Sequence, residues 1–429
     1  MKLTIATAGS RGDTQPYLAL CVALKKAGHD VTLAASENFG EWIKSYGVRF
    51  HPLAGDFTKL VQQAGVGSGG SGSPLEFFRT MRGTQRMVGP ILFQMGKDLV
   101  DACRGADRLL SALPLLSVDV AQKLDLPLTY LSVIPMVKTR TFAIPMLPPV
   151  PAFVNEFSYW LAQRTAWGLF GKTVDAFRGE ILNLPAWGSA GPFTFERQKG
   201  FRTLIGVSPV VIPPPPDWAG VAEVTGYWLL DDRDRVDGKG DAGYQPSAAL
   251  ADFLNAGPPP VFLGFGSMPD KDPAATTRLF VDALRLAGQR GIISMGWAGL
   301  GDIDLPETIH KLDYAPYAWL LPQMAMAVHH GGSGTTGAGL ASGVPSMVVS
   351  HGFDQFFWGN RIHTLGAGPK PLARGDLSAK RLAQAITQTL ADAGMKQRAA
   401  EVGAQIRAED GVGSAVRLIE NGAKTQAAL

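Results

Sequence analysis

A run of four consecutive prolines divides this 429-residue sequence into two halves. The prolines, residues 213–216, lie within the stretch SPVVIPPPPDW. Because consecutive prolines form a stiff, extended helix without internal hydrogen bonds, such a run acts as a spacer rather than as part of a core. We therefore predict four segments: a first domain over 1–212, a linker over 213–225, a second domain over 226–410, and a helical tail over 411–429 that packs back on the first domain.

Each half alternates short apolar stretches with segments of helical periodicity. Strands are predicted at 3–8, 31–35, 108–111, 128–133, 261–264, 291–295 and 325–329, and helices at 14–27 and 273–288. This alternation is typical of parallel sheets that are covered by helices on both faces. The predicted fold class is α/β, with two Rossmann-like parallel-sheet domains that face each other across a cleft. A cleft between domains is a favoured ligand site.

Composition excludes several classes of protein. Hydrophobic residues make up 46% of the chain and charged residues 18%, which is too apolar for a disordered protein. The net charge is only +3 and no basic stripe occurs, so we expect no nucleic-acid partner. No apolar stretch reaches the roughly 18 residues of a membrane span and no secretory signal is present, so we expect a cytoplasmic protein with at most peripheral membrane contact.

The two cysteines and the acidic residues do not have the spacing of a metal site. Cys21 and Cys103 have no CxxC partner and no histidine at ligand spacing, which favours buried free thiols. Asp231, Asp232 and Asp234 lie beside Arg233 in a polar stretch, where solvated charge explains them. We therefore expect no metal ion and no cofactor.

Two glycine-rich turns follow predicted strands in the second half. The stretch HHGGSGTTGAGLASGVP begins at His329, and the helix after it is predicted to start near Thr335. Backbone N–H groups at a helix start bind anions, and His330 could donate a further hydrogen bond. In the turn GFGSM, residues 264–268, Ser267 could bond a phosphate at the carboxyl end of its strand. Each turn, taken alone, is also compatible with a structural turn that binds no ligand.

Two polar motifs add side chains with possible roles in chemistry. The stretch SHGFDQFFWGN contains Asp354 and Gln355, whose donors and acceptors suit a row of sugar hydroxyls, although a plain polar loop would have the same residues. The N-terminal stretch GSRGDTQPY contains Asp13, which suits the N-cap of the helix that follows. Both motifs need their neighbours before a function can be assigned.

Taken in order, these motifs make the chain similar to the GT-B nucleotide-sugar glycosyltransferases, the family that includes plant and bacterial UDP-glycosyltransferases. It resembles the sterol glucosyltransferases and the antibiotic glycosyltransferases within that family most. The resemblance extends from residue 3 to about residue 375. It is carried by GSRGDTQPY, GFGSM, DYAPYAWLLPQ, HHGGSGTTGAGL and the Asp–Gln pair.

The resemblance implies a role for each matching residue. The donor diphosphate would be held by Ser267, His330, Gly332, Ser333, Gly334 and Thr335. Tyr314 would stack on the uracil ring, and Asp354 and Gln355 would bind the transferred hexose. Asp13 stands where plant relatives have a catalytic histidine, so it would be the general base that takes the proton of the acceptor hydroxyl. Ala338 departs from the pattern, because many plant relatives have a ribose-binding glutamate there.

The acceptor side has a weaker signature. An aromatic, proline-broken stretch indicates a cover over an apolar cleft, and we take Phe142, Trp160 and Trp167 as candidate acceptor-binding residues. Ordinary core packing would explain each of these residues equally well. The run GSGGSGS at 67–73 has the composition of a constructed flexible linker, and we interpret it as the replacement of a native loop.

The resemblance therefore predicts an inverting, metal-independent glycosyltransferase. It would move a hexose, glucose from UDP-glucose, to a hydroxyl of an apolar small molecule such as a sterol, polyketide or flavonoid. Its partners would be the UDP-sugar donor and that acceptor. Two other functions on the same fold stay open: a non-catalytic protein that binds a nucleotide sugar or lipid, and a carrier-lipid sugar transferase of envelope synthesis.

Overall fold

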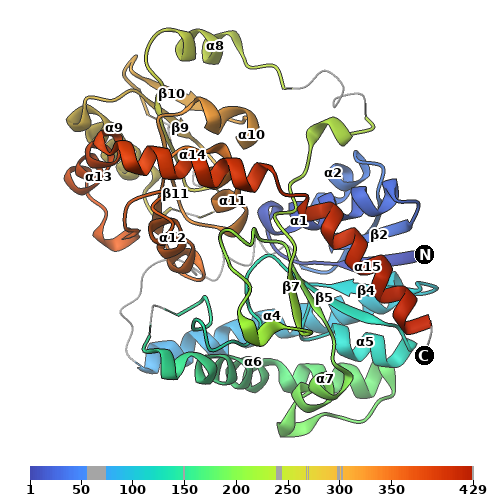
Figure 1. The fold of residues 1–429 in the computed structure, drawn as a ribbon. Coiled ribbons are helices and arrows are strands. Elements are labelled where there is room, and N and C mark those ends of the chain that lie inside the picture. Colours follow the sequence, from blue (N-terminus) through green and yellow to red (C-terminus); the bar gives the residue numbers. More distant parts are fainter. Residues whose placement is uncertain are drawn as a thin grey trace.

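Two parallel sheets, one in each lobe of the molecule, organise the computed structural model of this chain (Figure 1). The structure describes residues 1–55, 74–147, 150–237, 244–266, 268, 270–296, 300 and 303–427. The glycine- and serine-rich run at 67–73 lies outside these residues. Every strand pairing among the described residues is parallel, as the alternating sequence pattern predicts.

The first sheet has the strand order β3-β2-β1-β4-β5-β6-β7. Its strands are β1 (Lys2–Ala6), β2 (Asp30–Ser36), β3 (Arg49–Leu53), β4 (Arg108–Ser111), β5 (Leu128–Ser132), β6 (Thr203–Ile205) and β7 (Ala222–Val224). Its helices are α1 (Arg11–Lys26), α2 (Gly40–Lys44), α4 (Pro74–Ala102), α5 (Ser117–Leu124), α6 (Asn155–Phe177) and α7 (Phe193–Lys199). Leu18, Cys21 and Leu24 form the inner face of α1, and the whole side chain of each is buried against the sheet.

The second sheet has the order β10-β9-β8-β11-β12-β13. Its strands are β8 (Val261–Gly264), β9 (Gly291–Ser294), β10 (Ile309–Leu312), β11 (Met326–His329), β12 (Ser346–Ser350) and β13 (Leu372–Ala373). Its helices are α8 (Ala248–Asn255), α9 (Pro273–Ala287), α10 (Tyr317–Leu320), α11 (Ser333–Ser342), α12 (Gln355–Thr364), α13 (Ala379–Ala391) and α14 (Ala393–Arg407). Local sequence sets these bounds: for example, the Asp272 side chain caps α9 and Pro273 occupies its first position.

The chain passes between the two lobes later than the prolines indicate. Residues 213–225 were predicted as a linker, but they end in β7, which pairs with β6 at the edge of the first sheet. The stretch after β7 also stays on the first domain, where Tyr46 donates a hydrogen bond to Asp232 over 2.6 Å. The prolines are therefore a surface excursion of the first domain, and the crossing to the second sheet follows them.

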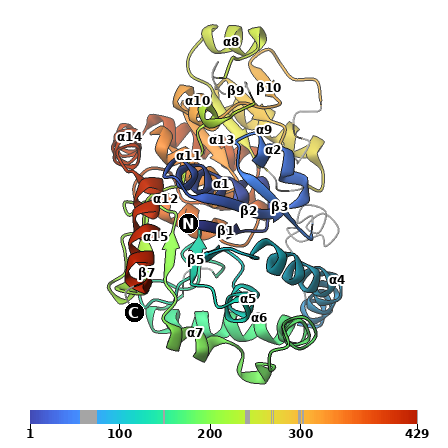
Figure 2. The same ribbon diagram turned by 90° about the vertical axis from the view of Figure 1, so that its right-hand side faces the viewer.

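The last helix returns to the first domain. Helix α15 (Gly411–Ala427) packs against α1 on the side of the first domain (Figures 1 and 2). Ala415, Val416 and Ile419 on α15 belong to the same buried cluster as β1, β2 and α1. Glu420 pairs with His29 over 3.0 Å. The main chain therefore crosses between the lobes twice.

Two further predictions concern the two cysteines and membrane-spanning helices. Cys21 and Cys103 are buried free thiols, as predicted. In the part of the chain that the structure describes, no helix has the length and apolar character needed to cross a bilayer.

Candidate active site between the two sheets

The carboxyl ends of the two sheets meet at one place. The hydroxyl of Ser333, at the first turn of α11, donates to the backbone carbonyl of Val133, just beyond β5, over 2.6 Å. A side chain at Gly334 would lie 3.6 Å from the carbonyl oxygen of Gly12 in the first turn of α1. The loops that end strands of one sheet therefore contact the loops that end strands of the other, which is where open α/β sheets bind ligands.

Asp13 lies in the first turn of α1, in reciprocal contact with the residue that caps this helix. We expected Asp13 to be the N-cap and the helix to begin near residue 14. Instead Ser10 is the N-cap, the helix begins at Arg11, and Asp13 is its third residue. The backbone N–H of Ser10 donates to Asp13 Oδ2 over 2.7 Å, and its hydroxyl donates to the same oxygen over 2.8 Å. The Ser10 side chain in turn faces the backbone N–H of Asp13, so the two residues form a capping box, which fixes the carboxylate at the carboxyl end of the first sheet.

Two opposing influences act on the Asp13 carboxyl. Burial raises its pKa above the ordinary value, because an ionised carboxylate loses hydration there. The two hydrogen bonds from Ser10 oppose this, since they stabilise the charged form. The net direction is upward, toward the range in which a carboxylate is a better proton acceptor at neutral pH. Both Ser10 bonds end at Oδ2, so Oδ1 is the oxygen that can face an acceptor.

The glycine-rich turn after β11 presents unpaired backbone donors to the cleft. Gly332 is the N-cap of α11, followed by Ser333, Gly334 and Thr335. The first backbone bond of the helix runs from the Thr336 N–H to Gly332. The N–H groups of Ser333, Gly334 and Thr335 are therefore the free ones of a helix N-terminus, aligned with the positive end of the helix dipole, whereas the Gly331 N–H donates to His329 Nδ1 over 3.1 Å. Such an arrangement suits a diphosphate, and binding by these residues stays a prediction.

His330 lies beneath this turn as a neutral imidazole. Burial, together with nearby His329 and His351, lowers the pKa of His330 to about 3. Its Nδ1 has no hydrogen-bond partner among the described residues. A side chain at Gly266, where φ is +58°, would lie 2.9 Å from the His330 ring, so glycine is needed for this approach. His330 can therefore donate one hydrogen bond to a phosphate oxygen, but not a positive charge.

Asp354 and Gln355 stand at the start of α12, opposite Asp13. Burial raises the pKa of Asp354 to about 6, with a smaller contribution from the negative charge of Asp13, while the bond from Trp358 opposes the rise. Trp358 Nε1 donates to Asp354 Oδ2 over 2.6 Å. Because Asp13 influences Asp354, the two carboxyl groups lie within electrostatic reach across the cleft.

The Gln355 amide is held inside the second domain. Its Oε1 accepts from the backbone N–H of His351 over 2.6 Å, and its Nε2 lies 3.4 Å from the sulfur of Met268. The side chain is 3% exposed. A hexose would therefore have to replace the weak contact with Met268 to engage the Gln355 amide.

Tyr314, the predicted base-stacking residue, lies after β10 with 54% of its surface exposed. The guanidinium carbon of Arg11 lies 5.8 Å from the Tyr314 ring centre and 4.6 Å from that of Trp42. Arg11 belongs to the first domain, so this contact bridges the domains beside the predicted base site. Arg11 was missed from the sequence, because nothing in GSRGD distinguishes it from a solvated arginine.

The structure describes one of the two remaining motif residues, Ala338, but not the other, Ser267. Ser267, predicted to bond the diphosphate, lies outside the described residues, although Gly266 and Met268 on either side of it face His330 and Gln355. Ala338 packs against a buried cluster of the second domain that includes Leu312 of β10 and Leu320 of α10, so residue 338 contributes a packing contact instead of a polar one.

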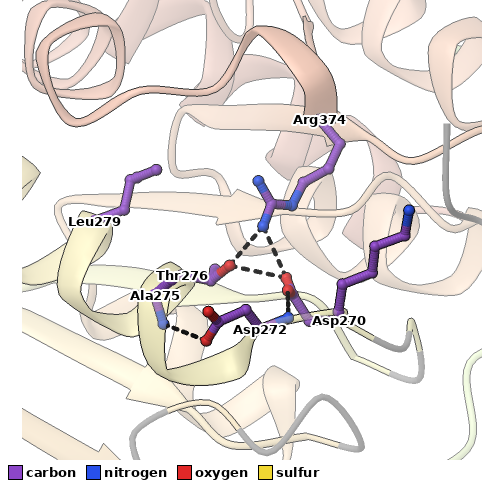
Figure 3. Close-up of a pocket in the computed structure, with 7 residues that line it drawn as sticks. Asp270, Asp272, Ala275, Thr276, Leu279 and Arg374 are labelled. Carbon is purple, nitrogen blue, oxygen red and sulfur yellow. Dashed lines mark hydrogen bonds and ion pairs between the residues drawn. The ribbon is translucent and has the colours of Figure 1, made fainter.

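An ion pair that the sequence did not predict, Asp270–Arg374, lies beside the GFGSM loop. The Asp270 carboxylate accepts from Arg374 over 2.9 Å and from the Thr276 hydroxyl over 3.0 Å, beside a hollow of about 220 Å³ (Figure 3). The guanidinium of Arg374 also lies 5.9 Å from the Phe265 ring. This ion pair connects the loop after β8 to the segment after β13. The two residues are far apart in the sequence, so no local motif could have predicted the pair.

The three candidate acceptor residues do not come together. Phe142 packs between Trp218 and Phe357, with ring centres 5.9 and 5.4 Å away, and so joins the two domains. Trp167 is 6% exposed, and its indole donates to the Gly188 carbonyl over 2.8 Å, so packing explains it. Trp160 is 50% exposed on the outer side of α6. Helical spacing alone could not distinguish these three surroundings.

Comparisons with known proteins agree with this arrangement. Residues 3–97 match the glycosyltransferase family 28 N-terminal domain, and residues 297–416 match the C-terminal domain of erythromycin biosynthesis protein CIII-like proteins. The chain is 32% identical over 426 residues to a sterol 3-beta-glucosyltransferase of Arabidopsis thaliana, covering 97% of this chain and 67% of the relative. It is 33% identical over 439 residues to a sterol 3-beta-glucosyltransferase of Yarrowia lipolytica, covering 98% of this chain but 28% of that relative.

Solved structures show the same fold. The glycotransferase of kitacinnamycin superposes with a TM-score of 0.67 at 20% identity, over 98% of each chain. The glycosyltransferase VinC, solved in complex with dTDP, superposes with a TM-score of 0.63 at 19% identity, over 99% of this chain and all of that one. At such identities these structures establish the two-domain GT-B architecture. Together with the 32% identical plant relative, they show that this chain belongs to the GT-B nucleotide-sugar glycosyltransferase family that includes the sterol 3-beta-glucosyltransferases.

Proposed function

We propose that this chain transfers glucose from UDP-glucose to the hydroxyl of a sterol or a similar flat apolar molecule, with inversion at the anomeric carbon. One observation carries the proposal: the α11 N-terminus lies against the first domain at two points, at Val133 through Ser333 and at Gly12, the residue before Asp13, through Gly334. The proposed diphosphate site and the buried Asp13 carboxyl would therefore face each other across one cleft. The curated relatives named as sterol glucosyltransferases support the choice of sugar and acceptor.

In the proposed reaction, the acceptor oxygen attacks the anomeric carbon while the bond from that carbon to the diphosphate oxygen breaks. The proton of the acceptor hydroxyl goes to Oδ1 of Asp13. Attack from the side opposite the leaving group inverts the anomeric configuration. The raised pKa of Asp13 fits this role, since general bases work best when their pKa approaches the working pH.

Charge that develops on the leaving UDP would be stabilised by the α11 N-terminus and the neutral His330. These donors are already fixed by the fold, so they need no rearrangement during the reaction. Because these donors can stabilise the charge on the leaving UDP, we propose that the reaction needs no metal ion. The exposed ring of Tyr314 would stack on the uracil, and Asp354 and Gln355 would bind the glucose hydroxyls.

The proposal is tested by incubating the protein with UDP-glucose and a panel of sterols, polyketides and flavonoids, followed by mass spectrometry. Asp13→Asn should lower kcat by about 10²–10⁴-fold while UDP still binds, because general-base catalysis is worth that much. Nuclear magnetic resonance of the product should show the β-anomer. Tight UDP binding without transfer or donor hydrolysis would instead favour a non-catalytic binding protein.

A further inference from the structure

A row of apolar side chains on the outer side of α6, and on the 3₁₀ turn Ala152–Val154 just before it, is largely exposed. Phe153 is 88% exposed, Phe157 54%, Trp160 50% and Leu161 46%. Their spacing places them on one side of a helix, at intervals of three to four residues. Solvated single apolar residues are common, but a contiguous row of aromatic side chains is not.

This exposure is not explained by poor packing of α6 itself. The opposite face of the helix is buried, with Tyr159, Val174 and Phe177 each at most 2% exposed. Helix α6 contacts α4 along the edge of the first domain, away from the second sheet in both views (Figures 1 and 2). The helix is therefore apolar on both faces, and only the inner face has a partner.

The loop before α6 continues the row and is fixed to the helix. The backbone N–H of Ile144 donates to the Ser158 hydroxyl over 2.9 Å, and Asn155 donates to the Arg140 carbonyl over 2.8 Å. Met146 in this loop is 50% exposed. We refer to Met146, Phe153, Phe157, Trp160 and Leu161 together as the α6 face.

The segment that carries the α6 face, residues 138–172, has a net positive charge. Residues 138–172 contain Lys138, Arg140, Arg164 and Lys172, against Glu156 as the single acidic residue. The side chains of Lys138 and Arg140 are 59% and 80% exposed, and both contact Glu156. The ring of Phe157 stacks on that of Trp160, with centres 5.3 Å apart. Aromatic rings flanked by cations are typical of helices that lie in the interface of an anionic bilayer.

We propose that the α6 face docks the first domain on an anionic lipid surface. Phe153, Phe157 and Trp160 insert into the boundary between head groups and acyl chains, and the exposed side chains of Lys138 and Arg140 contact the lipid phosphates. This inference does not depend on the proposed function, because it needs neither donor nor acceptor. A bilayer is favoured over a second copy of the chain because residues 138–172 carry four cations against one acidic residue, and a second copy would oppose this net positive charge with its own.

Vesicle co-sedimentation tests the proposal. The full chain is mixed with vesicles of phosphatidylcholine alone or with added phosphatidylserine. Phe153→Ser, Phe157→Ser and Trp160→Ser together should weaken binding to the anionic vesicles by about tenfold or more, because each removes a buried apolar contact. Lys138→Gln with Arg140→Gln should weaken only the preference for phosphatidylserine, and added salt should have the same effect.

A matched control uses three exposed apolar residues elsewhere. Val221, Leu229 and Leu286 are 47%, 51% and 57% exposed, and their combined change to serine should leave binding unaltered. Equal Tm values would show that both triple variants fold. Wild-type protein that stays in the supernatant with both vesicles, or an α6-face variant that sediments like wild type, would overturn the proposal. So would a dimer in light scattering that the α6-face variant abolishes, since that assigns the surface to a second copy.

Discussion

Removing the Ser10 hydroxyl should shift the pH dependence of the enzyme without removing its base. In wild type, Asp13 Oδ2 accepts two hydrogen bonds from Ser10, one from the backbone over 2.7 Å and one from the hydroxyl over 2.8 Å. Ser10→Ala deletes only the second. A hydrogen bond to a charged group contributes about 1.5 kcal/mol at the low end, and this corresponds to about one pKa unit.

The sign of the shift follows from which form the hydroxyl stabilises. It donates to the ionised carboxylate, so its loss favours the protonated form and raises the pKa of Asp13 further. A general base works only when deprotonated, so activity is lost as pH falls through that pKa. The acid limb of kcat/KM should therefore move up by about one pH unit, while the plateau at high pH changes little.

The assay is initial-rate glucosyl transfer from pH 4.5 to 9 with saturating UDP-glucose and limiting acceptor. Ser247→Ala is a matched control, because Ser247 caps α8 in the second domain through a 3.2 Å bond to the Leu250 N–H. Both variants lose a helix cap, which costs about 1 kcal/mol of stability. An unmoved acid limb in Ser10→Ala, or an equal shift in Ser247→Ala, would refute the reasoning.

Four further outcomes follow from the site. His330→Ala should lower kcat by about 10²–10³-fold as an oxyanion-type donor is lost, equally from pH 6 to 9 because this imidazole is already neutral; an unchanged kcat would contradict the role. Gly266→Ala should lower both kcat and Tm, because the added methyl group would collide with the His330 ring. Gly288→Ala has a similar φ of +62° but open space around it, so it should lower Tm by a few degrees and leave kcat unchanged. Equal kcat values for the two variants would show that the added methyl group does not disturb His330. Tyr314→Ala should raise the donor KM about tenfold and Tyr314→Phe should not, and equal effects would point away from ring stacking. Chelation with EDTA should leave the rate unchanged, and a loss that Mg²⁺ restores would require a metal in the mechanism.

Local patterns were sufficient to predict the regular elements of the fold. The strand β8 occupies 261–264 as expected, and α9 ends at Ala287, one residue before the predicted end. These elements have clear apolar periodicity, a proline or aspartate at the start and a glycine at the end. The start of α1 was misplaced by three residues, because Asp13 was taken as the cap without considering Ser10, which completes the capping box.

Contacts between distant segments could not be predicted in the same way. β7 has three residues, too few for a periodic signal, and only its pairing with β6 identifies it as a strand. The bridge from Arg11 to Tyr314 and the pair Asp270–Arg374 depend on how the domains and loops approach each other. The candidate site could therefore be predicted where a motif places a residue at a strand end, as for Asp13 and Ser333. The environment of Phe142 and Trp167 depends on tertiary packing, which aromatic spacing does not encode.

The return of α15 to the first domain has a consequence for synthesis on the ribosome. The inner residues of α1 emerge early, but Ala415, Val416 and Ile419 of the same buried cluster are translated about 400 residues later. Until then, the surface of α1 that these residues cover is exposed to water and to other nascent chains. We expect the amino-terminal half alone to be aggregation-prone and to be rescued by a peptide that carries residues 411–427. Such complementation in trans would show that the last helix completes a domain that was begun by the first strand.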